Sequence, residues 1–231
     1  MILRALSVVA LTLAASSAQA MVTHHFTRYS ITVDDSSAFG DVSMTGTSGA
    51  DGFFFGWAVP SSVYVISTGG TLASQTVDLP SFTITANAGY QLTGPVQGFM
   101  GNLVFNELGA GASTGVTVTG DIALNGVTVG TPIVDLLRAT TQTQSTPYPI
   151  AMGFLSGSGS TPVGGLSSFS FTHGKVTLSA SGGFYASISA QPQNVYTYSF
   201  SALAVPEPET YALMAAGLLA MGILASRRGG D

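Results

Sequence analysis

The sequence predicts an all-β protein whose central part forms a single β-sandwich or jelly-roll-like ectodomain. Three observations support this fold class. Apolar and polar residues frequently alternate with a period of two, and no window of the central part shows a sustained helical period. Turn-forming residues separate the alternating runs at intervals of about eight to twelve residues. Ser, Thr and Gly occupy the polar positions, so each predicted strand has one apolar face and one uncharged face.

The composition excludes several classes of protein. Apolar residues make up 45% of the chain and aromatic residues 10%, which is enough material for a core and argues against simple disorder. The net charge of -5 argues against a nucleic-acid partner, because such proteins carry a basic patch. The chain has no cysteine, which excludes a disulfide framework, a thiol nucleophile and a thiolate metal site.

Residues 1–20 have the features of a secretory signal peptide. Arg4 supplies a positive start, an apolar run follows, and Ala18 and Ala20 form an A-x-A cleavage site that signal peptidase would cut before Met21. The apolar run is about eleven residues long, whereas a helix that crosses a bilayer needs about twenty. We therefore expect a cleaved signal and an exported protein.

Residues 21–204 form the predicted ectodomain. Its strongest turn signal is Asn125-Gly126, because both residues tolerate the positive φ that a two-residue hairpin turn requires. Asp51-Gly52 and His173-Gly174 are weaker signals of the same kind. Strict alternation of apolar residues occurs at 29–33, 62–67, 81–85 and 115–119.

The last part of the ectodomain, residues 168–202, is predicted to form a three-strand meander followed by a fourth strand. The apolar faces of these four strands are Phe169 and Phe171; Val176, Leu178 and Ala180; Phe184, Ala186 and Ile188; and Tyr196, Tyr198 and Phe200. Residues 138–165 are rich in Thr, Gln, Ser, Pro and Gly and are predicted to be a long loop within one domain, because the strands after them are too few to bury a core alone. Thr131-Pro132 before residues 133–138 predicts a short helical turn, since proline suits the first position of a helix.

Candidate catalytic residues are few. Residues 111–115 match the G-x-S-x-G pattern of a nucleophile elbow around Ser113, which is the basis of a serine hydrolase alternative. An elbow needs a helix after the serine, whereas the β-branched run that follows here predicts a strand. We therefore expect a glycine-rich hairpin loop at this position and no enzymatic activity.

Candidate metal ligands are equally sparse. His24 and His25 are adjacent, and adjacent residues of a strand point to opposite faces, so they would not share one ion. Four aspartates lie close together in sequence but without the spacing of a calcium loop, so we expect them to form solvated turns: Asp34, Asp35, Asp41 and Asp51. The sequence thus predicts no metal site and no cofactor.

The most unusual local feature is the aromatic stretch at residues 53–57. On a strand, Phe53, Phe55 and Trp57 share one face. The favoured interpretation is the thickest part of the core, because an exposed stripe of three large aromatic residues would promote aggregation. The alternative is an exposed aromatic platform that stacks against sugar rings.

The C-terminus has three parts in a fixed order. Residues 205–210 hold Val205, Pro206, Glu207 and Pro208, and two prolines at alternate positions predict an extended, accessible peptide. Residues 211–225 carry no charge and are followed by Arg227 and Arg228. This apolar stretch predicts a transmembrane helix of about 22 Å, shorter than a hydrocarbon core of about 30 Å, with the arginines on the cytoplasmic side.

This order of a Pro-Glu-Pro motif, a short helix and a basic cluster over residues 205–228 resembles the PEP-CTERM sorting signal of Gram-negative bacteria. The resemblance implies retention in the inner membrane by the helix, followed by cleavage near Glu207 by an exosortase and transfer to the cell surface or extracellular matrix. The same signal is also labelled an ice-binding protein C-terminal domain. The Thr-x-Thr pairs of this chain follow no fixed period, so we expect no ice-binding array.

Together, the residues and the resemblance predict a non-enzymatic exported protein with a structural or adhesive role at the surface or in a biofilm matrix. Its expected partners are signal peptidase, exosortase and the membrane. An alternative is a module that binds exopolysaccharide through Phe53, Phe55 and Trp57, and a second alternative is the serine hydrolase.

Overall fold

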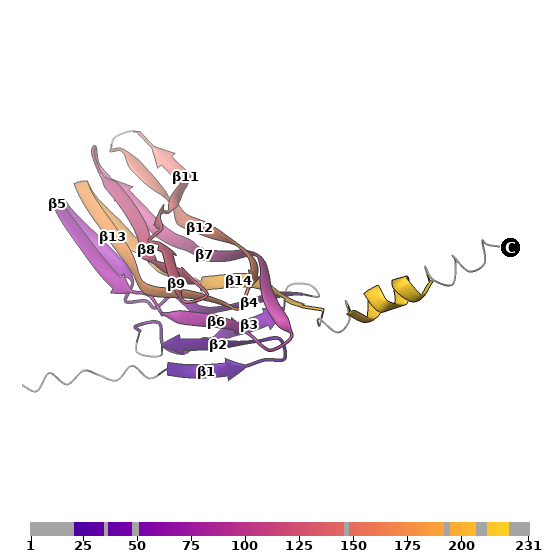
Figure 1. Ribbon diagram of the computed structural model, residues 1–231. Coiled ribbons are helices and arrows are strands. Elements are labelled where there is room, and N and C mark those ends of the chain that lie inside the picture. The colour runs from indigo at the N-terminus through magenta and orange to yellow at the C-terminus, as the bar shows by residue number, and fades with distance from the viewer. Residues whose placement is uncertain are drawn as a thin grey trace, which may run out of the picture.

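A computed structural model of the chain describes residues 21–34, 37–47, 51–145, 148–191, 195–206 and 212–221. Apart from one helix over residues 212–221, the regular structure consists of β-strands, as the sequence predicts (Figure 1). The fourteen strands are β1 (Met21–His25), β2 (Tyr29–Asp34), β3 (Met44–Thr47), β4 (Gly52–Ala58), β5 (Tyr64–Asp78), β6 (Phe82–Ala86), β7 (Tyr90–Leu108), β8 (Ser113–Leu124), β9 (Val127–Gly130), β10 (Ile133–Asp135), β11 (Leu137–Gln144), β12 (Ile150–Leu166), β13 (Ser168–Ser189) and β14 (Val195–Ala204).

All the strand pairs are antiparallel and belong to one sheet. Its main path runs β1-β2-β6-β13-β7-β14-β4-β3, and the other strands pair at its sides. The two longest strands, β7 and β13, pair with each other only over residues 104–108 and 185–189. Beyond that stretch each has its own neighbours, which are β12 and β14 for β7 and β5, β6 and β8 for β13.

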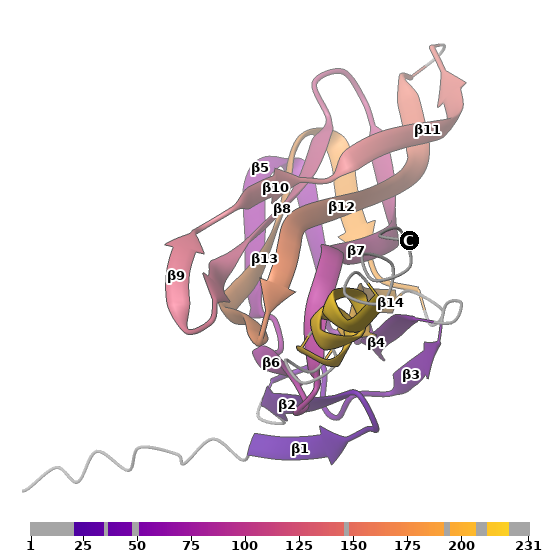
Figure 2. The same ribbon diagram turned by 45° about the vertical axis from the view of Figure 1, so that its right-hand side comes forward.

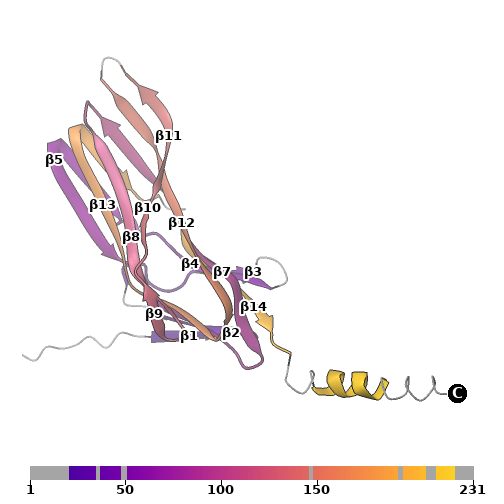
Figure 3. The ribbon, with the colours of Figure 1, turned by 45° about the horizontal axis from the view of Figure 1, so that its top comes forward.

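This branching makes the sheet curl into two facing walls. Figures 1 and 3 show β5, β13 and β8 in one wall and β7, β12 and β11 in the other. The short strand β10 pairs with β8 and also touches β12, so it lies between the walls (Figure 2). The all-β class is thus confirmed, whereas the finer prediction of a two-sheet sandwich or jelly roll is not, because the strands form one continuous curled sheet.

Aromatic side chains fill the core. β14 alternates strictly between buried and half-buried positions over most of its length, as a strand with one apolar face does. Its Tyr198 ring lies 4.4 Å, centroid to centroid, from Phe82 of β6, and Phe82 lies 4.9 Å from Phe55 of β4. These contacts join three strands that are far apart in sequence, so large apolar rings hold the curl closed.

The predicted hairpin at Asn125-Gly126 is confirmed. Both residues have positive φ, +49° and +78°, and they link β8 to β9. The Asn125 Oδ1 atom also accepts hydrogen bonds from the backbone N–H groups of Ser167 and Ser168, at 2.9 and 3.1 Å. Asparagine therefore serves both the local turn and the attachment of the turn to β13.

The predicted meander at residues 168–202 is wrong. Its first three strands are one strand, β13, and His173-Gly174 is a β-bulge inside it rather than a hairpin turn. His173 has a φ of +52°, and the register with β8 shifts between Thr172 and Lys175. Because β13 has partners on both edges around this point, the positive φ is absorbed as a bulge and the chain does not reverse. The expected fourth strand is present as β14.

The predicted long loop at residues 138–165 and the predicted helical turn at residues 133–138 are also wrong. These residues form β10, β11 and most of β12. All eight residues of β11 are exposed, since this strand lies at an edge and pairs only with β12. Both faces of this edge strand are solvated, which explains its polar Thr-Gln composition. The strand therefore lacks the alternation of apolar and polar residues from which a strand is predicted.

Neighbouring glycines form a corner, at which the strands bend, in the wall that contains β5, β13 and β8. Gly182 and Gly183 of β13 have φ values of +70° and +61°, and they lie beside Gly111, in the connection from β7 to β8, and Gly70 of β5. A Cβ atom on Gly182 would lie 1.9 Å from the backbone oxygen of Gly111. The strands can approach this closely only because no side chain stands between them.

Candidate functional site

The sorting segment begins where the folded sheet ends. β14 lies between β7 and β4, and its last residue, Ala204, pairs with Tyr90 of β7. The next residue, Val205, still donates a backbone hydrogen bond to the Gly89 oxygen at 2.8 Å, and it is followed by the exposed Pro206. The backbone hydrogen bonds of the sheet therefore end directly before the Pro-Glu-Pro motif.

Arg28 secures the end of β14. Its guanidinium forms an ion pair with Asp51 and donates a hydrogen bond to the Ala202 oxygen at 3.2 Å. The Ala202 N–H in turn donates to the Asp51 oxygen at 3.2 Å. The Arg28 side chain thus links the last strand to the residue before β4, at a position three residues before Val205.

The helix over residues 212–221 presents apolar side chains to the outside. All ten of its residues are exposed, and the large ones are Leu213, Met214, Leu218, Leu219 and Met221. Figure 1 shows this helix beyond the end of β14, away from the sheet. Within the part of the chain that the structure describes, no helix has the length and apolar character needed to cross a membrane.

Several predicted sorting residues lie outside the described residues. They are Ala18 and Ala20 of the signal cleavage site, Glu207 and Pro208 of the motif, and Arg227 and Arg228 of the basic cluster. Met21, the expected mature N-terminus, is described. It is 51% exposed and begins β1 at an edge of the sheet.

The structure corrects the glycan-platform alternative. Phe55 and Trp57 are both 0% exposed and pack in the core, so they cannot stack against a sugar. Phe53 is half-buried, and its ring contacts Tyr29 at a centroid distance of 4.6 Å. The core interpretation of the stripe is therefore correct for Phe55 and Trp57. Both side chains point between the walls, because alternate residues of β4 point to the same face.

Two of the aspartates, Asp34 and Asp51, differ from the prediction of solvated turns. Asp34 is 5% exposed at the end of β2, and Asp51 is held by Arg28. Asp41 is exposed, while Asp35 lies outside the described residues. Among the described residues there is no group of three or more His, Cys, Asp or Glu side chains that could hold a metal ion.

The histidines and Ser113 take ordinary structural positions. His24 and His25 are neighbours on β1, as expected. Ser113 begins β8, where it pairs with Ser181 of β13, so a strand rather than a helix follows it. His173 lies 3.0 Å from Asp121 through its Nδ1 atom. Hydrogen bonds from Thr131, and then from His173, lower the pKa of the exposed Asp121 carboxyl group.

The buried Glu107 forms an ion pair with Arg138 of the exposed strand β11, and the sequence analysis missed this pair. Glu107 is 5% exposed, and it accepts hydrogen bonds from Arg138 Nη1 at 2.6 Å and from Thr114 at 2.7 Å. The Arg138 guanidinium lies 4.0 Å from the centre of the Phe105 ring, and its bond to Glu107 raises the pKa of Arg138. The signal was present, because Leu103, Phe105 and Glu107 share one face of a strand and only the last is charged.

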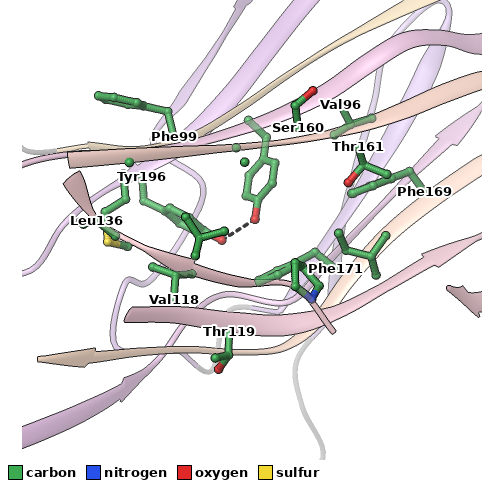
Figure 4. A pocket seen from close by; sticks show the side chains of 18 residues that line it. Val96, Phe99, Val118, Thr119, Leu136, Ser160, Thr161, Phe169, Phe171 and Tyr196 are labelled. Atoms are coloured by element: carbon green, nitrogen blue, oxygen red, sulfur yellow. Dashed lines mark hydrogen bonds between the residues drawn. The ribbon is translucent and has the colours of Figure 1, made fainter. Parts of the chain in front are cut away.

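The other missed feature is an apolar cavity of about 210 Å³ between the two walls. It is lined by β7, β12 and β14 on one side and by β8, β10 and β13 on the other (Figure 4). Tyr196 and Tyr198 both line it, and their hydroxyl oxygens are 2.5 Å apart. The sequence analysis placed these tyrosines on the apolar face of a strand but did not predict a cavity beside them.

The fold and the chain end define a class, an all-β protein whose last strand runs directly into a C-terminal sorting segment. A profile of the PEP-CTERM protein-sorting motif matches residues 204–228. The chain therefore carries a PEP-CTERM protein-sorting motif at residues 204–228, and this motif implies export and processing by an exosortase. No curated protein and no solved structure matched the chain.

Proposed function

We propose that this chain is a non-enzymatic protein of the cell surface or extracellular matrix. A signal peptide would export it, the C-terminal helix would hold it in the inner membrane, and an exosortase would then process it near Glu207. The observation that carries the proposal is the match of the sorting motif to residues 204–228, directly after the last strand.

The position of the motif supports processing. An enzyme that reads an extended peptide needs a substrate that is free of secondary structure, and regular pairing ends at Ala204. Because β14 lies between two neighbours and is tied by Arg28, cleavage beyond Val205 would leave every strand of the sheet in place. Processing would therefore release the ectodomain intact.

The exposed helix supports a membrane anchor. Leu213 and Leu219 are 74% and 69% exposed, and burying such side chains in lipid stabilises each by about 1.5–3 kcal/mol. The predicted span of residues 211–225 is shorter than the hydrocarbon core. Arg227 and Arg228 would make up the difference by extending their side chains to the interface.

The sheet surface supports a structural or adhesive role rather than catalysis. Its outer positions carry hydroxyl groups that pair across strands, such as Thr76 with Thr177 at 3.1 Å and Thr23 with Thr32 at 3.0 Å. Ser113, the one serine in a hydrolase-like pattern, begins a strand. An uncharged hydroxyl surface of this kind suits a protein that lies within a polysaccharide matrix.

The proposal is tested by replacing Pro206, Glu207 and Pro208 with alanine in the full chain expressed in a host that has an exosortase. The variant should remain in the membrane fraction at its unprocessed mass, because the enzyme no longer finds its motif. Immunoblots of membrane and released fractions measure this.

The matched control replaces the exposed Thr140 and Gln142 of β11 with alanine, which should leave processing unchanged. If the motif variant is processed and released like the unaltered chain, the sorting proposal is wrong.

A further inference from the structure

The cavity between the walls has the size and lining of a site for a small ring compound. Its volume is about 210 Å³, and its walls include Val96, Met100, Val118, Leu136, Phe169 and Phe171. A dry apolar cavity of about 150 Å³ in another protein binds benzene. This cavity therefore has room for a six-membered ring and a few further atoms.

The two tyrosines give the cavity one unused hydrogen-bond donor. Tyr196 and Tyr198 are 2% and 7% exposed, and their hydroxyl groups bond to each other. Only one of the two protons can lie in that bond, and among the described residues neither hydroxyl has another hydrogen-bond partner. An unsatisfied buried donor is costly, so an acceptor oxygen placed here would be bound favourably.

The lining also fixes the charge of the ligand. None of the described residues around the cavity is a Lys, Arg, His, Asp or Glu. Burial raises the pKa of both tyrosines, so both hydroxyl groups keep their protons at neutral pH. A carboxylate ligand would lose its hydration without gaining a counter-charge, whereas a neutral carbonyl would not.

The cavity has an open side. Phe99 is 39% exposed at its edge, and the exposed Ser160 and half-buried Thr161 of β12 lie beside it (Figure 4).

From the volume, the single free donor and the uncharged lining, we propose that this cavity binds a small neutral ring compound that carries one hydrogen-bond-accepting oxygen. The ring lies against Phe169 and Phe171, and the oxygen accepts the free hydroxyl proton of the Tyr196–Tyr198 pair. This site is separate from the sorting segment and does not depend on processing.

The test uses two probes of nearly the same shape, acetophenone and α-methylstyrene, which differ in having a carbonyl oxygen or a methylidene group. Isothermal titration calorimetry on the full chain should show about tenfold tighter binding of acetophenone, because only its oxygen accepts the tyrosine proton. Benzoate, which is charged at neutral pH, should not bind. Trp57, the single tryptophan, stacks on Tyr196 at 5.8 Å, so its fluorescence gives a second readout.

Two variants locate the site. The double variant Tyr196→Phe/Tyr198→Phe should bind both probes with the affinity of α-methylstyrene, and this retained binding shows that the variant is folded. Gly159→Leu should abolish binding of both, because a Cβ atom on Gly159 has room 3.7 Å from Val134 and a longer side chain fills the cavity. Gly164→Leu, on the same strand with no atom within 4 Å of its Cβ, is the matched control and should bind normally.

Four results would overturn the proposal. They are no binding of acetophenone, equal affinity for the two probes, preference for acetophenone in the double phenylalanine variant, and normal binding to Gly159→Leu.

Discussion

Tyr196 and Tyr198 show how one fold gives two alternating residues a joint role. Both belong to the inward face of β14, and each hydroxyl has the other as its hydrogen-bond partner. A buried polar group that loses its only partner costs about 1–3 kcal/mol, whereas replacing both partners with apolar groups of the same shape can be nearly neutral. The pair therefore behaves as a unit.

We predict that Tyr196→Phe or Tyr198→Phe alone lowers the free energy of unfolding by about 1–3 kcal/mol, because each leaves one buried hydroxyl unpaired. The double variant should be more stable than either single variant. Urea denaturation of the four proteins measures the non-additivity, and strictly additive losses would contradict the prediction.

The same pair gives a dependence on alkaline pH. Burial raises the pKa of both tyrosines in the folded state above the usual value of 10.0. The unfolded chain therefore loses these two tyrosine protons at lower pH than the folded chain does. The contribution of the pair to the free energy of unfolding is fully present below pH 10 and is lost as the pH rises further. In the double phenylalanine variant this loss should be missing.

At the scale of elements, β13 organises the sheet. It pairs with β6, β8, β5 and β7 in turn, and it changes direction at the bulge of residues 173–174 and at the corner of residues 182–183. Positive φ values and close backbone approach allow these bends without breaking the strand. The curl that encloses the cavity thus depends on the residues at these two bends.

We predict that Gly182→Ala destabilises the protein by more than about 2 kcal/mol, because positive φ is strained for alanine and the new Cβ would overlap the Gly111 oxygen. Gly69→Ala is the matched control. Gly69 has a similar φ of +63° but no atom within 4 Å of its Cβ, so its cost should be only about 1 kcal/mol. Thermal unfolding compares the two, and equal losses would show that the close approach is not important.

At the scale of the whole molecule, the folded sheet and the C-terminal helix have opposite surfaces. The sheet hides its aromatic residues between the walls, whereas all ten described residues of the helix are exposed although most are apolar. Such a surface is stable only when a further apolar phase covers it. The proposed anchor follows from this contrast.

We predict that Leu218→Glu/Leu219→Glu moves the unprocessed chain from the membrane to the soluble fraction, because a charge within lipid costs about 2.5–3.5 kcal/mol. The same two charges at Thr140 and Gln142 of β11 should leave the distribution unchanged. Membrane flotation of both variants, with the Pro-Glu-Pro motif replaced to prevent release, measures the effect. Flotation of the helix variant with the membranes would contradict the anchor.

Sequence reasoning succeeded where a property is local. Alternation predicted β14, the Asn-Gly pair predicted the β8–β9 turn, and the cost of exposed aromatics predicted the burial of Phe55 and Trp57. It failed at β11, which is exposed on both faces, and at His173-Gly174, where a turn-like pair lies inside a strand. In both places the neighbours in space, and not the local residues, set the outcome.

The sequence by itself determined the strand character of the chain and the sorting motif at its end, because periodicity and residue order are properties of the chain as a line. Only the tertiary structure decided that Glu107 meets Arg138 and that two tyrosine hydroxyls meet at an apolar cavity. These contacts depend on strand register and on the curl of the sheet, which join residues of distant strands. That curl comes from the branching of β7 and β13 and from the glycine corner, and it encloses the cavity where we place the ligand.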